Sequence, residues 1–321
     1  MSVRLVDIAK ATGFSLMTVS LVLNPRKGEC RISKKTQEKI KKVAKEMNYT
    51  PNMTARILSG AKSNVVGVMF CADNDYFYAD LQLRIDDALR SRGYTGFYTF
   101  WKSLDEFDRS LSAMKQFNVC GILTGHDLDV KFPDVPVICY GFLHQKFESV
   151  YPSQQEMMHC AVEYALKQGY TKIGFVGRIE LKSRVAAFND EVTSLGGTVS
   201  FCKLFARNES PQEGVDEFLK QNTDTEVLIF GNDQVAMEWM AELQSRNIRI
   251  PQDIKVIGVN NVNYCTNVTP RLTSVDFSLS SLGDLLVDRL IKHIEEPDSI
   301  RENIKLPITI VERDSCPAKS K

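Results

Sequence analysis

The residue types that carry covalent, redox and metal chemistry are present in this sequence, but their spacing forms no site. The eight cysteines lie at least 19 positions apart, which leaves no C-x-x-C pair for zinc or thiol exchange. The four histidines lack H-E-x-x-H spacing, and the sequence has no G-x-G-x-x-G, no G-x-x-x-x-G-K-[ST] and no G-x-S-x-G. We therefore expect reduced, mostly buried thiols, no metal, no cofactor and no enzymatic activity. Asp73 and His126 remain only isolated catalytic candidates.

The charged residues divide the chain into a basic head and an acidic body, although the net charge is zero. Residues 1–62 hold 13 Lys and Arg against 4 Asp and Glu, whereas the remaining residues hold 27 against 36. This asymmetry predicts a polyanionic partner for the head. A solvated basic face without a partner is the alternative.

Length and composition describe an ordinary globular chain. Its 321 residues suffice for two or three domains, and 43% hydrophobic with 25% charged residues exclude a disordered or collagen-like protein. No apolar run approaches the roughly 20 residues that cross a bilayer. Asp7 and Lys10 come too early for a secretory signal, so we expect a cytoplasmic protein.

The basic head has the spacing of a helix-turn-helix. Residues 5–24 read as two short helices around a turn at Gly13, with Ser15 as the N-cap of the second helix. Val19, Val22 and Leu23 give that helix a core-facing stripe. A third helix, opened by Ser33, carries Ile40, Val43, Ala44 and Met47 on one face and Lys34, Lys35, Lys39, Lys41, Lys42 and Lys45 elsewhere. Residues 52–60, after Pro51, are too short to form a stable helix alone.

This head resembles the DNA-binding module of the lactose-repressor (LacI/GalR) family of bacterial transcription regulators. The resemblance rests on six stretches, which are Val6–Ala9, Gly13–Ser15, Thr18–Ser20, Asn24, Asn48–Asn52 and Ala55–Gly60. Three helices followed by Asn-Tyr-x-Pro-Asn and a leucine-bearing segment form a specific combination, whereas a bare helix-turn-helix pattern does not.

The resemblance implies which residues contact DNA. Ser15 to Asn24 would be the recognition helix in the major groove, with Leu16, Met17, Ser20 and Leu21 facing base edges and Thr18 near phosphate. Asn52 to Ser59 would fold into a hinge helix only on operator DNA, where Leu58 would wedge open a central base step and Ala55 would lie on the same face. The alternative for Leu58, an ordinary buried leucine, is weak because so short and polar a segment offers little core.

Two departures from the family pattern affect the predicted DNA contacts. Most relatives carry arginine at the position of Leu21, and arginine is the usual guanine reader. We therefore expect unusual half-sites in which thymine methyl groups are contacted in preference to guanine edges. The longer loop of residues 25–32 carries three cations that either contact phosphate or remain solvated, and the sequence favours neither.

The body alternates short apolar runs with amphipathic stretches, which predicts an α/β fold with two doubly wound parallel sheets. The expected strands are 65–71, 96–100, 121–123, 135–140, 172–176, 199–204, 227–230 and 254–259. The expected helices are 81–92, 104–117, 156–168, 184–195, 211–221, 234–246 and 279–296.

The body also resembles the LacI/GalR family, so the likeness spans essentially the whole chain. Arg184 with Phe188 and the stretches 231–237, 249–258 and 269–275 carry it. The resemblance implies two periplasmic-binding-protein-like subdomains joined by three crossings, after Val150, near Asp276 and around Glu302. The expected division is a DNA-binding domain at 1–50, a hinge at 51–62, an N-subdomain at 63–150 plus 277–301 and a C-subdomain at 151–276 plus 302–316.

An effector would bind between these subdomains, and residue-wise transfer gives Tyr76, Phe77, Arg184, Asp233 and Asn260 as its contacts. Tyr76 and Phe77 would lie on the loop after the first strand and stack on a sugar or base. The alternatives are that Asp233 caps a helix beginning at Gln234 and that Arg184 is a surface residue; Trp239 is expected in the core. The resemblance favours a sugar or sugar derivative as the effector. Tyr151–Ser153 replaces the relatives' Val-Asp-Asn, and Asn260 stands where relatives often have an aspartate, so the identity of the effector stays open and purine or amino-acid-like ligands remain alternatives.

The combined interpretation is a homodimeric repressor of a sugar-utilisation operon that binds a near-palindromic operator and responds to a small-molecule effector. The dimer face is expected on the first subdomain and the helix 279–296, and no leucine heptad follows for a tetramer. Two alternatives remain: a cytoplasmic sugar sensor whose head no longer binds a specific operator, and an α/β enzyme with an appended DNA-binding head.

Overall fold

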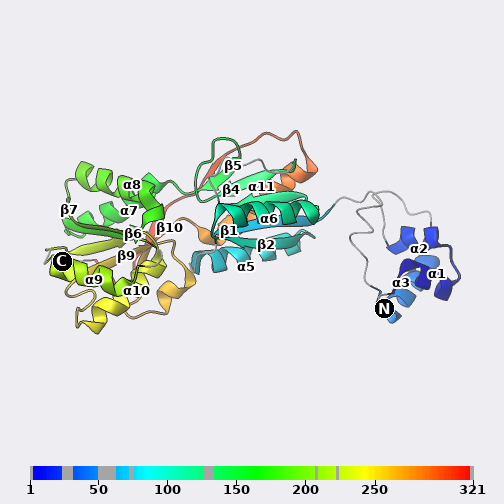
Figure 1. Ribbon diagram of the computed structural model, residues 1–321, viewed down its shortest axis with the longest axis horizontal. Coiled ribbons are helices and arrows are strands. Elements are labelled where there is room, and N and C mark those ends of the chain that lie inside the picture. The colour runs from blue at the N-terminus through cyan, green and yellow to red at the C-terminus, as the bar shows by residue number, and fades with distance from the viewer. Residues whose placement is uncertain are drawn as a thin grey trace. The chain divides into compact units, whose positions relative to one another are not determined.

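The computed structural model describes residues 3–23, 32–49, 63–71, 76–125, 134–206, 209–221 and 224–318. The chain forms two compact units, Met1–Asn64 and Val65–Lys321, which are the head and the body of the sequence analysis. Figure 1 shows short helices alone in the first unit and sheets with covering helices in the second.

The head contains the three expected helices: α1 (Leu5–Thr12), α2 (Leu16–Leu23) and α3 (Lys34–Glu46). Ile8, Val19 and Ile40, one from each helix, are fully buried and form the centre of its small core. Gly13 ends α1 with φ of 74°, a conformation that costs glycine little. The chain bends by 113° between α1 and α2, within the usual range of about 90–120° for a helix-turn-helix.

The first lobe of the body is a six-stranded sheet with helices on both faces. Its strands are β1 (Val65–Cys71), β2 (Thr95–Trp101), β3 (Gly121–Thr124), β4 (Val137–Tyr140), β5 (Glu148–Tyr151) and β11 (Ile304–Lys305). Its helices are α5 (Tyr76–Ser91), α6 (Leu104–Gln116) and α11 (Leu279–Glu295), of which α5 and α11 pack against each other.

The second lobe repeats this architecture. Its strands are β6 (Lys172–Arg178), β7 (Thr198–Phe205), β8 (Val227–Phe230), β9 (Lys255–Val259), β10 (Thr273–Asp276) and β12 (Thr309–Val311). Its helices are α7 (Gln154–Lys167), α8 (Lys182–Ser194), α9 (Pro211–Lys220) and α10 (Asp233–Ser245), with the 3₁₀ turns η1 (Ile179–Leu181) and η2 (Asn263–Thr266). The described strands pair in parallel except β12, which runs antiparallel to β10. The predicted fold class is confirmed.

The chain crosses between the lobes at residues 152–153, 277–278 and 306–308. The third crossing corrects the boundary predicted around Glu302. Ile304 pairs with Val150 and Lys305 with Tyr151, which keeps β11 in the first sheet. The pattern of the sequence did not reveal this two-residue strand, because so short a segment has no periodicity.

Both sheets have the strand order that places a ligand crevice at their carboxyl ends. The order is β2-β1-β3-β4-β5 in the first lobe and β7-β6-β8-β9-β10 in the second. In each, the order reverses beside the first strand of the lobe, and ligands of such sheets bind outside the strand carboxyl ends at that reversal. The segments after β1, β6, β8 and β9 are therefore the places to look for a site.

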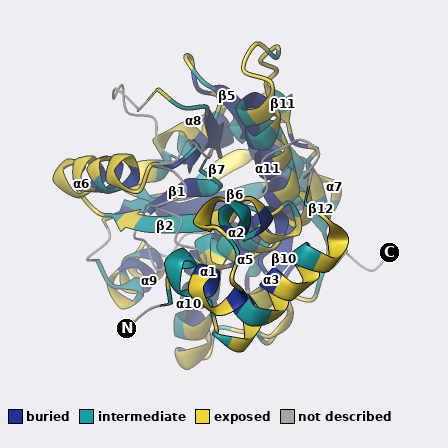
Figure 2. Ribbon diagram, turned by 90° about the vertical axis from the view of Figure 1, so that its right-hand side faces the viewer, coloured by how far each residue is buried: buried dark blue, intermediate teal, exposed yellow. Residues whose placement is uncertain are grey.

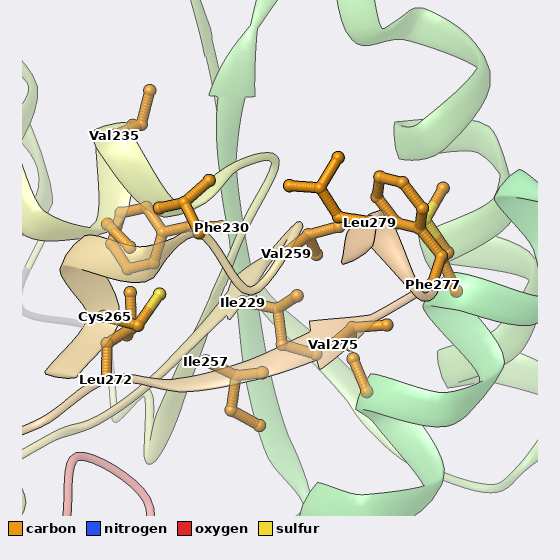
Figure 3. Close-up of a cluster of buried hydrophobic side chains, with 14 of the residues drawn as sticks. Ile229, Phe230, Val235, Ile257, Val259, Cys265, Leu272, Val275, Phe277 and Leu279 are labelled. Atoms are coloured by element: carbon orange, nitrogen blue, oxygen red, sulfur yellow. The ribbon is translucent and has the colours of Figure 1, made fainter. Parts of the chain in front are cut away.

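The core of the second lobe is continuous and rich in aromatic rings. Phe230 of β8 packs on Trp239 of α10, with ring centroids 5.7 Å apart, so the predicted core position of Trp239 is confirmed. Figure 3 shows Phe277 and Leu279, which flank the second crossing, beside the apolar side chains of β8, β9 and β10. The crossing is thus held by apolar packing.

The cysteines and the apolar helices were also compared with what the sequence predicts. The cysteines of the described segments are free, but only Cys139, Cys265 and Cys316 are buried, and Cys202 is exposed. In the part of the chain that the structure describes, no single helix is long and apolar enough to cross a membrane; α1 and α2 pass that test only as a bent pair, by length and composition.

Candidate functional site

The second helix of the head begins with a side-chain cap. The Thr18 backbone N–H donates to Ser15 Oγ at 3.1 Å, and the two hydroxyl oxygens lie 2.9 Å apart. This bond satisfies one of the amides that the first turn of a helix leaves without a partner. The capping role predicted for Ser15 is confirmed, and it fixes where α2 starts.

The exposed face of α2 is apolar and uncharged. Leu16, Met17 and Leu21 are 52%, 75% and 45% exposed, while Val19 and Val22 hold the helix to the core. Large apolar side chains exposed side by side on so short a helix indicate a contact surface. Such a face can contact thymine methyl groups but offers no bidentate donor to guanine.

The positive charge of the described head lies mostly on α3. Ser33 caps this helix by accepting from the Thr36 amide at 3.3 Å, and Figure 2 shows that α3 has both exposed and buried surface. Lys39 donates to the Thr12 carbonyl at 3.3 Å and lies 5.3 Å from the Phe14 ring centroid. Lys39 therefore also holds α3 to α1, although it is exposed to solvent like the other five lysines of α3.

Several predicted DNA contacts lie outside the described residues. These are Asn24 at the end of the recognition helix, the loop residues 25–31, and the hinge residues Asn52, Ala55 and Leu58. Their roles stay predictions. Among the predicted contacts that are described, Thr18 and Ser20 are partly buried beside the exposed Leu16, Met17 and Leu21.

In the body, the predicted effector residues follow the carboxyl ends of strands from both lobes. Tyr76 and Phe77 come after β1, Arg184 after β6, and Asp233 and Asn260 directly after β8 and β9. Tyr76 and Phe77 are not on a loop as expected. They form the first turn of α5, and their ring centroids lie 4.4 Å from that of Tyr264 and 6.0 Å from that of Phe277, respectively.

Arg184 is buried and engaged from two sides, which rules out the surface role considered for it. Its Nε donates to Oε1 of Gln154 at 2.7 Å, and its Nη1 donates to the Gly231 carbonyl. Gln154 in turn donates to the Gly141 carbonyl of the first lobe at 3.5 Å. The guanidinium is thereby fixed between the start of α7 and the end of β8.

Asp233 is fully buried, and its carboxylate holds the loop after β9. Oδ2 accepts from the Val262 amide at 2.9 Å, and Oδ1 accepts from Ser274 Oγ at 2.5 Å. The alternative that Asp233 caps a helix from Gln234 is wrong. The helix starts at Asp233 itself, and the Asn232 side chain caps it by accepting from the Val235 amide at 2.9 Å.

The carboxylate of Asp233 also controls a neighbouring thiol. Burial raises the pKa of Cys265, and the negative charge of Asp233 and a hydrogen bond to it raise that pKa further. Cys265 is therefore a neutral, buried thiol at neutral pH and not a nucleophile. In the described segments no group of three or more His, Cys, Asp or Glu could hold a metal ion.

Asn260 has a backbone conformation that bulky residues avoid. Its φ is 111°, that of Asn261 is 51°, and the Asn260 N–H donates to the Val275 carbonyl at 2.9 Å. Asparagine tolerates positive φ better than other side chains. The strain turns the chain sharply after β9 towards η2, which brings Asn263 and Tyr264 to the first lobe.

Sequence reasoning missed the partners that orient these residues. Gln154 orients Arg184, Asn232 caps α10, and Asn263 donates to Asp80 of the first lobe with its backbone N–H at 3.2 Å and its Nδ2 at 3.1 Å. Only Asn232 had a local signal, since asparagine before a helix is a common N-cap. The other two pairs join residues that are distant in sequence.

Comparisons with known proteins agree with this architecture. Residues 4–52 match the bacterial regulatory proteins of the lacI family, and residues 162–316 match the periplasmic binding protein-like domain. The chain is 24% identical to the ribose operon repressor of Escherichia coli (strain K12) over 329 aligned positions, which cover 97% of this chain and 98% of that protein. The chain therefore combines a lacI-family head with a periplasmic binding protein-like body.

Solved structures show the same fold for this chain. The lac repressor dimer bound to operator and the anti-inducer ONPF superimposes with a TM-score of 0.88 at 21% identity, covering 99% of this chain and all of that one. A LacI family regulator from Enterococcus faecium with bound ribose gives 0.69 at 19% identity, over 80% of this chain and 100% of that one. Because these identities are low, the likeness is one of fold.

Proposed function

We propose that this chain is a LacI-family protein, a homodimeric transcriptional repressor that binds a near-palindromic operator. Binding of a small effector to the body changes its affinity for that operator. The observation that carries the proposal is the capped helix α2, which exposes Leu16, Met17 and Leu21 after a 113° turn. An apolar helix face of this kind in a basic head fits a major groove.

Base contacts are proposed for Leu16, Met17, Ser20 and Leu21. Thr18 is proposed to lie near phosphate, and Ser15 and Asn24 are proposed DNA contacts at the two ends of the recognition helix. The hinge contacts of Asn52, Ala55 and Leu58 complete the proposal. Since α2 carries no charge from Leu16 to Leu23, the described lysines of α3 are the proposed source of phosphate contacts. Sequence reading and electrostatic attraction would then come from two different helices.

A homodimer is proposed because the first lobe exposes apolar side chains on α5 and on its edge strand. Leu83 of α5 is 66% exposed, and Phe100 of β2 is half exposed. In addition, α11 lies close against α5 at Gly283, where a side chain would meet Arg84. A second copy covering α5 and β2 would place two heads on one duplex, as a near-palindromic operator requires.

The proposed effector site lies between the strand carboxyl ends of the two lobes and includes Tyr76, Phe77, Arg184, Asp233 and Asn260. Aromatic rings with amide and guanidinium groups suit the faces and hydroxyls of a sugar. The relative named ribose operon repressor and the ribose-bound neighbour support a sugar as the class. The site is proposed to lie in a cytoplasmic protein without enzymatic activity.

The proposal is tested by selecting bound DNA from a random pool with the full-length protein, with and without ribose and other sugars. We expect an inverted repeat with a flexible central step, and a change in the yield of bound DNA with one sugar. Recovery of unrelated sequences would contradict the proposal.

A sugar sensor without operator binding is the competing function. The exposed apolar face of α2 argues against it, because a head that no longer bound DNA has no reason to keep three large apolar residues in water. Removal of residues 1–62 should leave ligand binding intact under both functions. Under the sensor alternative, the full chain would bind all duplexes equally. Under the proposed function it would bind one duplex in preference.

A further inference from the structure

The two lobes also contact each other away from the three crossings. The first two turns of α5, in the first lobe, contact η2, in the second lobe, through segments more than 180 positions apart in the sequence. η2 reaches this place because Asn260 and Asn261 turn the chain with positive φ directly after β9.

The polar part of this contact uses both oxygens of one carboxylate. Asp80 Oδ2 accepts from the Asn263 backbone N–H at 3.2 Å, and Oδ1 accepts from Asn263 Nδ2 at 3.1 Å. Asp80 is 8% exposed, and no lysine or arginine among the described residues forms an ion pair with it. Its charge therefore depends on the two donors of the opposite lobe, and separation of the lobes would return it to water.

The aromatic part lies one helical turn away. The Tyr76 and Tyr264 rings have centroids 4.4 Å apart and an interplanar angle of 33°, and both rings remain partly exposed. Behind them, Phe77 lies 6.0 Å from Phe277, the residue at which the chain crosses between the lobes. The polar and aromatic contacts join the same two elements, α5 and η2, and would open and close together.

We propose that Tyr76 and Asp80 with Asn263 and Tyr264 form an interlobe clasp that holds the lobes together before any effector binds. Asp80 is then a positioning residue, and the strength of the clasp sets how much of the closed arrangement the ligand-free protein populates. An effector shifts the balance between the open and closed arrangements only as far as it binds one more tightly than the other. Because the clasp sets the starting balance, it limits how much the effector can change operator affinity. This role in regulation rests on the proposed function, whereas the mechanical role does not.

The test compares full-length variants that remove graded parts of the clasp. Asp80→Ala removes both hydrogen bonds, Asn263→Ala removes only the side-chain bond, and Tyr264→Ala removes a partly exposed ring with little risk to folding. Asp86→Ala is the matched control, because Asp86 lies on the same helix but bonds Tyr98 and Arg90 of its own lobe. Asp80→Asn keeps one acceptor oxygen and should restore part of the contact.

The first readout is hydrogen exchange of ligand-free protein at residues 260–268. We expect Asp80→Ala to accelerate exchange there roughly tenfold or more, Asn263→Ala and Asp80→Asn to act less, and Asp86→Ala to leave it unchanged. Adding Tyr76→Ala to Tyr264→Ala should have little further effect, since each removes the same stack. Equal exchange at residues 260–268 in Asp80→Ala and the unsubstituted protein would overturn the clasp.

The second readout is the affinity of the same ligand-free proteins for the selected operator. We expect Asp80→Ala and Tyr264→Ala to change it about fivefold or more in the same direction. Asp216→Ala, which removes only bonds to Arg246 within the second lobe, is the control for this readout and should stay within twofold. Accelerated exchange with unchanged operator affinity would overturn the regulatory role. If the unsubstituted protein selects no operator but hydrogen exchange in the variants changes as expected, the proposed function is wrong and the interlobe clasp is supported.

Discussion

The Nε–H of Arg184 donates to Oε1 of Gln154 at 2.7 Å, so the first residue of α7 orients a buried guanidinium in α8. Gln154→Ala would leave that donor buried without an acceptor. We expect a loss of about 1–3 kcal/mol in the free energy of unfolding, measured by urea denaturation with Trp239 fluorescence. Gln244→Ala, which removes an exposed bond to the Thr269 carbonyl, is the control and should cost under about 0.5 kcal/mol. Equal effects of the two substitutions would contradict the orienting role.

Substitution of Asp233 should lower the free energy of unfolding more than substitution of Gln154. Asp233→Ala would leave the Val262 N–H and the Ser274 hydroxyl without their buried acceptor, at an expected cost of about 2–4 kcal/mol. Gly258→Ala should act in the same direction, because a Cβ at this position would collide with the Asp233 carboxylate. Urea denaturation of both variants checks this, and wild-type stability of Asp233→Ala would show that the carboxylate does not hold the loop after β9.

Because base contacts are proposed for α2 and phosphate contacts for α3, we expect that the DNA-sequence preference and the salt dependence of DNA affinity can be changed separately. Leu21→Arg should shift the selected half-site towards guanine, because arginine donates two bonds to its major-groove edge. Replacing Lys34 and Lys35 by alanine should leave the selected sequence unchanged and reduce the slope of log affinity against log salt by about one for each phosphate that is no longer neutralised. Selections and salt titrations on the three proteins measure both quantities. A changed sequence preference in the lysine variant would contradict this division.

The buried carboxylate of Glu148 predicts a dependence of stability on pH. Burial raises its pKa, but hydrogen bonds from Arg289, His293 and the Glu302 N–H outweigh burial, and the pKa lies below the ordinary value. A carboxylate with a lowered pKa stabilises the fold above its unfolded pKa of about 4.3, and this stability is lost as the pH falls through the folded value.

Glu148→Gln should therefore flatten the change in urea midpoint between pH 7 and pH 3. At pH 7 it should cost about 3 kcal/mol, since the largely buried Arg289 would lose its buried anion and keep only the exposed Glu302 carboxylate at 3.5 Å. Glu296→Gln, an exposed change at the end of α11, should keep the dependence of the unsubstituted protein. An unaltered pH profile in Glu148→Gln would show that the carboxylate is not ionised in this network.

Much of the fold could be predicted from the sequence where local pattern decides it. The stripes of the head, the Ser15 and Ser33 caps and the apolar runs of β1, β6, β8 and β9 follow from periodicity and capping alone. The start of α5 could not, because Tyr76 and Phe77 join the helix only through rings that lie elsewhere in the chain.

The candidate site shows the same limit. The family resemblance suggested Arg184 and Asp233, but their geometry depends on Gln154, Val262 and Ser274, which are 29 to 41 positions away in sequence. The two-residue strand β11 and the interlobe bonds of Asp80 are likewise set by tertiary contacts. Local sequence therefore predicted the helices and the longer strands but not β5, β10, β11 or β12, and long-range contacts decided how side chains meet.

The most direct test of the account is the affinity of the full-length protein for its selected operator and for a scrambled duplex of equal length, across a salt series. We predict a preference for the operator of roughly a thousandfold or more, with affinity that falls steeply as salt rises. Leu21→Ala should reduce the preference and leave the salt slope unchanged. Equal affinity for the two duplexes at every salt concentration would contradict the claim that α2 of this protein reads DNA sequence.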